Sequence, residues 1–397
     1  MRPIAMPPAL ILALAPMGVA AQDFDWGPQN TDFPPAFREQ FRAPLTPSDV
    51  TLNMERLAGG LEHPWGIATL PGDAGWLVTE RPGRLRHLAP DGTLSPPLSG
   101  TPEVLAARQG GLLDVALAPD FASTREVYLT YAKPVEGGSA TAAARGVLAK
   151  DLSGLADVKD IFVQAPASRN PMHFGSRVVF LADGTVAVTT GEHSSEQERL
   201  FAQDLDKTYG KVIRVNRDGS VPADNPFVGV AGAIDTIWSL GHRNIQGAAV
   251  DADGTLWTIE HGPKGGDELN RPEPGLNYGW PVISYGERYR GGAIGSGDAV
   301  REGLEQPVYF WDPVIAPGGM AFHAGAAFGD WNGDILASSL NPGGVVRLSL
   351  DDGVVVEEER LLRDVGRVRD IEVLADGSFL VLIDSGNGSV LHVTPGG

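Results

Sequence analysis

The chain has 397 residues and a formal net charge of −19, and it contains no cysteine, which excludes disulfides and thiolate-bound metals. The strong negative charge argues against nucleic acid or an anionic membrane surface as a partner. The 51 glycines and 31 prolines exceed average usage, as expected where tight turns join many short strands.

The first 21 residues have the organisation of a secretory signal peptide. Arg2 provides a positive start, residues 9–19 are apolar, and Val19-Ala20-Ala21 forms a small-residue cleavage site. The alternative, a buried N-terminal helix, conflicts with the prolines at positions 3, 7, 8 and 16. No later run reaches the roughly 20 apolar residues of a membrane-spanning helix. We therefore expect export to the periplasm. Residues 22–49, which follow the signal peptide, are proline-rich and are expected to form an extended arm.

From Val50 onward one pattern recurs, in which a turn signal precedes a run of alternating apolar residues. Asp-Gly or a related turn before such a run is a strong hairpin signal. Almost no segment has helical periodicity, and residues 112–117 are predicted to form a strand. The six copies of the pattern begin at Leu70, Leu117, Leu181, Asp251, Trp331 and Leu374.

Six β-rich units in one long chain predict an all-β fold, a six-bladed β-propeller that occupies residues 50–397 as one domain. Residues 390–393 are expected to pair with a strand near Val50 and close the ring. A pair of β-sandwiches or a β-helix is the alternative, although a parallel β-helix would have shorter and more regular repeats. The glycine-rich segment 291–297 is interpreted as part of a surface loop.

The segment from Ile237 to Pro281 concentrates charged and turn-forming residues around one short apolar strand, residues 255–259. A segment needed only for packing would be mostly apolar, with turn residues at its ends. Polar groups at both ends of a strand are typical of loops that carry chemistry on a rigid scaffold. We interpret this segment as the floor of a cofactor site.

Several motifs together resemble the soluble quinoprotein glucose/sorbosone dehydrogenases, and within that family the aldose sugar dehydrogenases. The motifs that carry the resemblance are HPWGIATLPG (63–72), RQGGLLDVALAPDF (108–121), HFGSRVVF (173–180), YGKVIRV (209–215), GHRNIQG (241–247), EHGPKGGDELN (260–270), GLNYGWP (275–281), IAPGGMAF (315–322) and GRVRD (366–370). The resemblance implies a six-bladed propeller that uses pyrroloquinoline quinone (PQQ) with calcium to oxidise the C1 hydroxyl of aldose sugars to the lactone.

The resemblance assigns the catalytic roles to three residues. His173 matches the general base that removes the sugar hydroxyl proton, a role that suits a neutral imidazole. Gln109 matches a residue beside the sugar. Arg243 matches a residue that faces the quinone, where a guanidinium can stabilise developing negative charge. The glucose-dehydrogenase branch has an acid before this histidine, whereas the neighbour here is Met172, so another group must orient the imidazole.

The resemblance also implies the groups that hold the cofactor and calcium. The cofactor residues are Arg243, Asn244, His261, Arg367, Arg369 and Asn341, the last at the position of a lysine in the glucose-dehydrogenase branch. Arg367 and Arg369 are predicted to share one face of a strand, where two guanidiniums suit a tricarboxylate; Asp364 and Asp370 are their alternative partners. The calcium ligands are the carbonyls of Gly262 and Pro263 beside the cofactor, with Glu268 and the carbonyl of Tyr278 at a second ion.

The sequence thus predicts a sugar oxidoreductase that passes electrons to an external acceptor. A calcium-dependent propeller hydrolase of the lactonase kind would use the same acidic loop and a histidine, but it would not need the arginine pair. A non-catalytic binding propeller would not need Gln109, His173 and Arg243 together.

Overall fold

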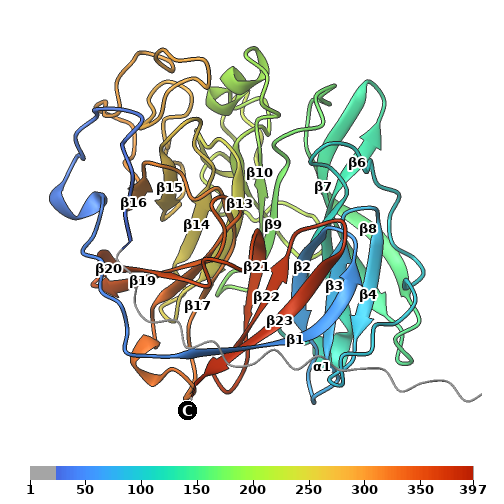
Figure 1. Cartoon of the computed structure of the whole chain (residues 1–397). Helices are drawn as coiled ribbons and strands as arrows, with labels where there is room; N and C mark the ends of the chain where they lie inside the picture. The colour runs from blue at the N-terminus through green and yellow to red at the C-terminus, as the bar shows by residue number, and fades with distance from the viewer. Residues whose placement is uncertain (1–23, 397) are drawn as a thin grey trace, which may run out of the picture.

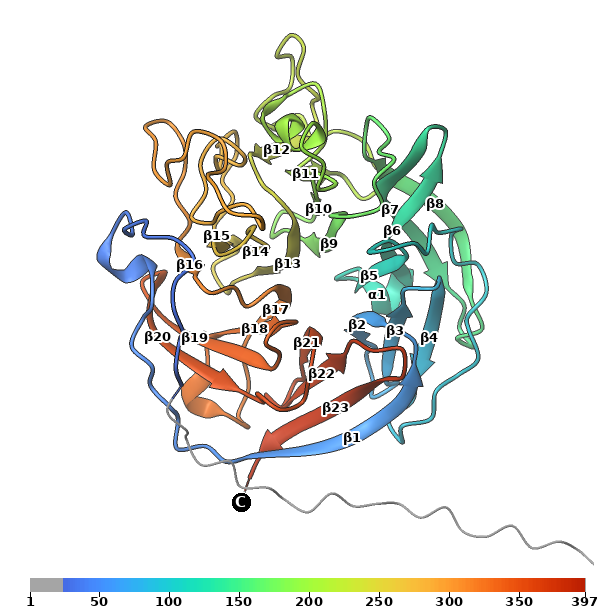
Figure 2. The same cartoon turned by 45° about the horizontal axis from the view of Figure 1, so that its top comes forward.

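The computed structural model describes residues 24–396, which form six antiparallel sheets arranged as the blades of a β-propeller (Figures 1 and 2). The predicted all-β, six-bladed fold is therefore confirmed. The predicted signal peptide, residues 1–21, lies outside the described residues. None of the helices among residues 24–396 has the length and apolar character needed to cross a bilayer.

The strands follow one another blade by blade along the chain. The first sheet comprises β2 (Pro64–Thr69), β3 (Trp76–Glu80) and β4 (Arg84–Leu88). The second sheet contains β5 (Leu112–Leu117), β6 (Glu126–Val135), β7 (Gly138–Leu148) and β8 (Leu155–Val163). The third contains β9 (Gly175–Phe180), β10 (Val186–Thr190), β11 (Lys211–Val215) and β12 (Ile237–Leu240). The fourth contains β13 (Ile245–Val250), β14 (Leu256–Glu260), β15 (Asp267–Asn270) and β16 (Tyr309–Trp311). The fifth contains β17 (Pro317–Phe322), β18 (Ile335–Ser339), β19 (Val345–Asp351) and β20 (Val354–Leu361). The helical segments are short: η1 (Arg38–Gln40), α1 (Phe121–Thr124), η2 (Glu198–Gln203) and η3 (Gly329–Trp331).

The sixth blade joins the two ends of the propeller. It contains β21 (Val368–Val373), β22 (Phe379–Ile383) and β23 (Gly388–Pro395), and β1 (Leu52–Leu61) adds antiparallel to β23 as the outer strand. Residue pairs run from Leu52 with Pro395 to Leu61 with Gly388. The predicted closure of the ring by residues 390–393 is confirmed: β1, which leads into the first blade, pairs with the last strand of the sixth blade.

The six turn signals all lie between the first and second strands of a blade. In two of them the side chain of the turn aspartate accepts a hydrogen bond from the backbone two residues on: Asp183 from Thr185 and Asp376 from Ser378, each at 2.9 Å. This Asx-turn geometry is the physical reason that the Asp-Gly signal marks a reversal of the chain.

The segment before β1 runs along the outside of the propeller (Figure 1). The carboxylate of Asp312 accepts backbone hydrogen bonds from Asn30 at 2.8 Å and Thr31 at 3.0 Å. Isolated parallel bridges join Phe41 to Phe310 and Leu45 to Glu358, on the edge strands β16 and β20. The arm therefore covers two sheet edges that would otherwise expose unpaired backbone groups.

Hydroxyl groups on second strands link neighbouring blades near the centre. The Thr130 hydroxyl on β6 accepts the backbone hydrogen of Asp114 in its own blade at 2.9 Å and donates to the carbonyl of Ser176 in the next blade at 3.0 Å. Thr79 and Thr189 make equivalent links. These links fix the innermost strands β2, β5, β9 and β13 relative to one another.

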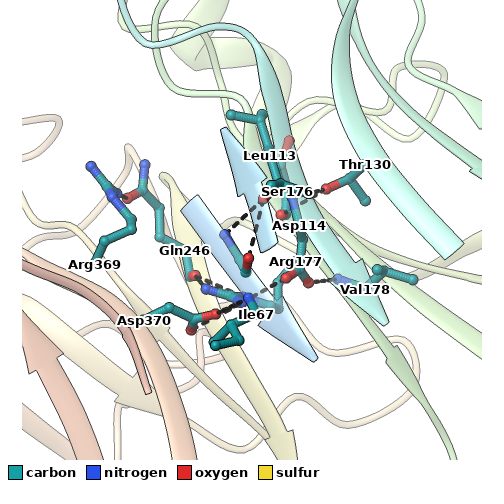
Figure 3. Close-up of polar contacts among 12 residues, drawn as sticks. Ile67, Leu113, Asp114, Thr130, Ser176, Arg177, Val178, Gln246, Arg369 and Asp370 are labelled. Atoms are coloured by element: carbon teal, nitrogen blue, oxygen red, sulfur yellow. Dashed lines mark hydrogen bonds and ion pairs between the residues drawn. The ribbon is translucent and has the colours of Figure 1, made fainter. Parts of the chain in front are cut away.

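An ion cluster lies among the innermost strands of three blades (Figure 3). The Arg177 guanidinium on β9 contacts Asp114 on β5 at 2.7 Å and Asp370 on β21 at 3.1 Å, and all three side chains are buried. Arg177 also donates two hydrogen bonds to the backbone carbonyl of Gln246 on β13. Burial raises the pKa of Asp114 to about 7 and raises that of Asp370 as well, while the guanidinium opposes both shifts.

Two glycines on innermost strands provide the space for this cluster. A Cβ atom at Gly319 would lie 1.7 Å from the Asp370 carboxylate, and a Cβ atom at Gly66 would lie 2.9 Å from that of Asp114. Any side chain at Gly319 would therefore displace the carboxylate from Arg177.

We predict that Arg177→Met lowers the free energy of unfolding by about 3–5 kcal/mol, because it leaves two buried carboxylates without their guanidinium. Urea unfolding followed by circular dichroism measures the change. The control is Arg145→Met, which removes a partly exposed ion pair with Glu126 and is expected to cost at most about 1 kcal/mol. Equal losses in the two variants would contradict this account of the cluster.

Candidate functional site

The predicted site residues converge at one end of the propeller because of where they fall relative to the innermost strands. Gln109 precedes β5, His173 precedes β9, and Arg243 and Asn244 precede β13, so each lies at the start of an innermost strand. His261 follows β14, which is antiparallel to β13 and therefore ends at the same end of the ring (Figure 2).

His173 is buried and paired with a carboxylate that the sequence analysis did not identify. Its Nδ1 atom lies 3.0 Å from Oε1 of Glu192, which follows the end of β10 beside the start of β9. Because a carboxylate accepts this hydrogen bond, Nδ1 carries the proton and the lone pair of Nε2 is free. Glu192 thus orients the imidazole in place of an acid at position 172. The sequence signal that could have identified it is an acidic residue shortly after β10, the strand that pairs with β9.

The surroundings keep His173 neutral. Burial and the nearby Arg243 charge lower its pKa below the usual value, and the hydrogen bond and charge of Glu192 oppose that shift. Glu192 keeps a lowered pKa despite its own burial, because of its hydrogen bond to His173 and the neighbouring positive charges. The pair therefore consists of an ionised carboxylate and a neutral imidazole at neutral pH, which is the state a general base requires.

Two side chains brace the backbone around His173, whose φ of 45° lies in the left-handed region. The Gln109 side-chain oxygen accepts the His173 backbone hydrogen at 2.8 Å. The Asn244 side-chain oxygen accepts the backbone hydrogen of Gly175 at 3.0 Å. Gln109 and Asn244 thus hold the unusual backbone conformation that directs the imidazole.

Arg243 lies beside this pair. Its guanidinium donates to the carbonyl of His261 at 2.8 Å and lies 5.2 Å from the ring centre of Trp280. Its Nε atom is 4.0 Å from Glu192 and is buried without a hydrogen-bond partner. Its backbone is fixed by a 2.5 Å hydrogen bond to the Glu260 carboxylate.

Arg367 and Arg369 share one carboxylate, Asp384, at 3.3 Å and 2.9 Å. The two arginines were predicted to lie on one face of a strand. Arg367 instead lies one residue before β21 and is exposed, whereas Arg369 lies within β21 and is buried. Neither Asp364 nor Asp370 pairs with them; Asp370 belongs to the Arg177 cluster. Arg367 also donates to the carbonyl of Leu340, which places it next to the exposed Asn341.

Three of the four predicted calcium residues line a cavity of about 10 Å³, close to the space that one water occupies. Gly262, Pro263 and Glu268 line it, together with Glu260. Tyr278 is not among the lining residues; its ring stacks at 4.7 Å on His242, which bonds Glu260 at 3.0 Å.

Among residues 24–396, neither Glu260 nor Glu268 forms an ion pair with a lysine or arginine, and Glu260 pairs only with His242. Burial, and then the charge of Glu260, raise the pKa of Glu268 well above its usual value. Asn270 donates to both carboxylates, at 3.1 Å and 3.2 Å, while its own buried side-chain oxygen has no partner. Two carboxylates and an unpaired amide oxygen fit a hard cation. No three histidine, aspartate or glutamate side chains in residues 24–396 are grouped for a metal, so main-chain oxygens would have to complete the ligand set.

Unpaired nitrogens collect at the same end of the propeller. Of the nine buried side-chain nitrogens in residues 24–396 that lack a hydrogen-bond partner, five lie at this end: Nε of Arg81, Arg243 and Arg369, Nε2 of His261 and Nε1 of Trp280. Buried polar groups are normally paired, so this concentration of donors fits a ligand rich in carboxylate and carbonyl oxygens. The residues present therefore fit PQQ as well as calcium.

Comparison with known proteins agrees with this geometry. Residues 61–392 match the family model "Glucose / Sorbosone dehydrogenase". The chain is 43% identical to aldose sugar dehydrogenase YliI of Escherichia coli, covering 88% of this chain and 95% of that protein. It is 25% identical to quinoprotein glucose dehydrogenase B of Acinetobacter calcoaceticus, covering 87% of this chain and 89% of that protein. The structure of the PQQ-bound aldose sugar dehydrogenase from Streptomyces coelicolor superposes with a TM-score of 0.71 at 26% identity, covering 87% and 99% of the two chains.

The fold and these matches define a propeller oxidoreductase that acts on sugars, as the sequence predicted. The chain belongs to the glucose/sorbosone dehydrogenase family.

We predict that the pKa of His173 lies below the usual value for histidine and falls further in Glu192→Gln, because the carboxylate that stabilises the imidazolium is lost. Titration of ¹³C-labelled histidines by NMR measures both values. Glu198→Gln is the control, since this carboxylate lies in the same loop but bonds Ser168 and not His173. An unchanged or raised His173 pKa in Glu192→Gln would contradict the assigned pair.

Proposed function

We propose that this protein catalyses the PQQ- and calcium-dependent oxidation of the C1 hydroxyl of aldose sugars to the lactone. The observation that carries the proposal is the buried His173–Glu192 pair, with its free Nε2 atom, beside Arg243 and a group of unpaired donors. A hydrolase that uses calcium and a histidine gives no reason for the guanidinium groups at this end of the propeller.

In the proposed reaction His173 takes the proton of the sugar C1 hydroxyl at Nε2, and its Nδ1 proton stays on the hydrogen bond to Glu192. PQQ, when bound, supplies the quinone that accepts the hydride from C1. The O–H and C1–H bonds break, the C1–O bond gains double-bond character, and the proton and the electron pair leave separately. Glu192 stabilises the imidazolium that forms, so its negative charge is used when the proton arrives.

The chain's own charges have distinct roles in this proposal. Arg243, fixed by Glu260 and by the carbonyl of His261, would stabilise the negative charge that develops opposite C1. Arg367 and Arg369 would hold carboxylates of the cofactor. The carbonyls of Gly262 and Pro263 would hold one calcium ion, which polarises a carbonyl as a Lewis acid, and Glu268 would hold a second.

The side chains of Asn244, His261 and Asn341 would make different contacts with the cofactor. The Asn244 oxygen is occupied by Gly175, which leaves its amide hydrogens for a ligand. His261 has an unpaired Nε2 atom and a pKa lowered well below its usual value by burial and by the Arg243 charge, so it would act as a neutral contact. Asn341 is uncharged and contributes at most hydrogen bonds. Electrons would then pass to an external acceptor, and the N-terminal sequence supports a periplasmic location.

Reconstitution tests the proposal. The apo-protein is titrated with PQQ in calcium or in excess chelator, and reduction of a dye by glucose is then followed. We expect saturable binding and glucose-dependent dye reduction in calcium, and loss of both in chelator. In His173→Ala, PQQ is expected to bind while dye reduction falls at least about 100-fold, the usual contribution of a general base. Undiminished turnover in this variant would exclude His173 as the base, and failure of the wild type to bind PQQ would overturn the proposal.

A further inference from the structure

Arg81 is a guanidinium without a partner at the functional end of the propeller. It follows β3, and its side chain makes no hydrogen bond or ion pair with residues 24–396, while its Nε atom is buried. The adjacent acid cannot serve it, because the Glu80 carboxylate is occupied by Arg84 at 3.0 Å and Arg86 at 3.1 Å. Arg81 is partly exposed, but its buried N–H group at Nε lacks an acceptor and calls for an explanation.

The backbone of Arg81 is held from two sides. Its backbone hydrogen bonds the carbonyl of His63 at 3.1 Å, and its carbonyl accepts the backbone hydrogen of Leu112 at the start of β5 at 3.1 Å. A Cβ atom at Gly111 would lie 2.1 Å from the Arg81 carbonyl, so the glycine permits this close approach. The side chain therefore starts from a fixed position between the first two blades.

That position is next to the arginine pair of the sixth blade. The His63 ring, one hydrogen bond from the Arg81 backbone, lies 2.8 Å from Asp384, the carboxylate that Arg367 and Arg369 share. The charge of Arg81 acts together with that of Arg367 to lower the pKa of buried Arg369, after the larger effect of burial. Arg81 thus adds a third guanidinium near the pair that shares the Asp384 carboxylate, so positive charge exceeds negative charge in this group.

Resting on the proposed function, we propose that Arg81 is a third cofactor-binding arginine, which donates to a carboxylate of PQQ and so forms an anion cradle with Arg367 and Arg369. A polycarboxylate would satisfy the unpaired Nε atoms of Arg81 and Arg369 and neutralise the excess charge. The cradle spans the first and sixth blades, so the cofactor would also bridge the two ends of the propeller chain.

Direct binding to the full-length apo-protein tests this inference without any use of turnover. Dissociation constants for PQQ in calcium are measured by quenching of tryptophan fluorescence. Arg81→Gln is expected to weaken binding about tenfold or more, the effect of losing one charge-assisted hydrogen bond. Arg81→Lys keeps the charge and is expected to retain most of the affinity. Arg84→Gln is the matched control: it removes an arginine three residues away that pairs with Glu80, and it is expected to bind like the wild type.

The trimethyl ester of PQQ separates loss of a carboxylate contact from a general disturbance. The wild type and Arg81→Gln are expected to bind the ester equally, because it offers no negative charge to Arg81. Equal affinity of both proteins for PQQ itself would overturn the inference and leave the proposed function intact. An equal loss of affinity for PQQ and for the ester would also overturn it. If the wild type does not bind PQQ at all, the proposed function fails and the inference fails with it.

Discussion

The site depends on one buried interaction, the contact of Arg177 with Asp114 and Asp370. It joins the innermost strands of three blades, and the bonds to the Gln246 carbonyl extend it to a fourth. His173, the pair Arg243 and Asn244, and Arg369 lie at or just before the starts of the same strands. The Gln246 side chain also accepts a hydrogen bond from Arg369 at 2.6 Å (Figure 3). The packing that fixes the strands therefore fixes the distances between the base, the central arginine and the arginine pair.

The site gathers several arginines within a chain that is acidic overall. The chain carries a net charge of −19, yet Arg81, Arg243, Arg367 and Arg369 gather at one end. Glu192 and Glu260 lie beside Arg243, and Asp384 pairs with Arg367 and Arg369. Asp384 keeps a strongly lowered pKa there, despite its burial, because of the arginines and His63. Burial and the Arg243 charge also lower the pKa of His173, which keeps the imidazole neutral. The same environment thus suits an anionic cofactor and preserves a base.

Local chemistry made the fold predictable from the sequence, because six Asp-Gly-type turns each mark the passage from the first to the second strand of a blade. The site was only partly predictable. Glu192 lies 19 residues from His173, and only the pairing of β9 with β10 brings them together. The Arg177 cluster depends on contacts between blades, and the role of Asp384 depends on the pairing of β21 with β22. No local pattern in the sequence predicts either contact. The sequence suggested Asp364 and Asp370 for the arginine pair because proximity along the chain was the only guide.

The central claim is that C1 of an aldose gives up its hydrogen in this site. The most direct measurement is single-turnover reduction of the PQQ-loaded protein by glucose and by glucose deuterated at C1, followed through the quinone absorbance. The account predicts that the bound quinone is reduced by both sugars, and more slowly by the deuterated one, because the C1–H bond breaks in the step observed. Equal rates with the two sugars, or no reduction of the bound quinone, would contradict it.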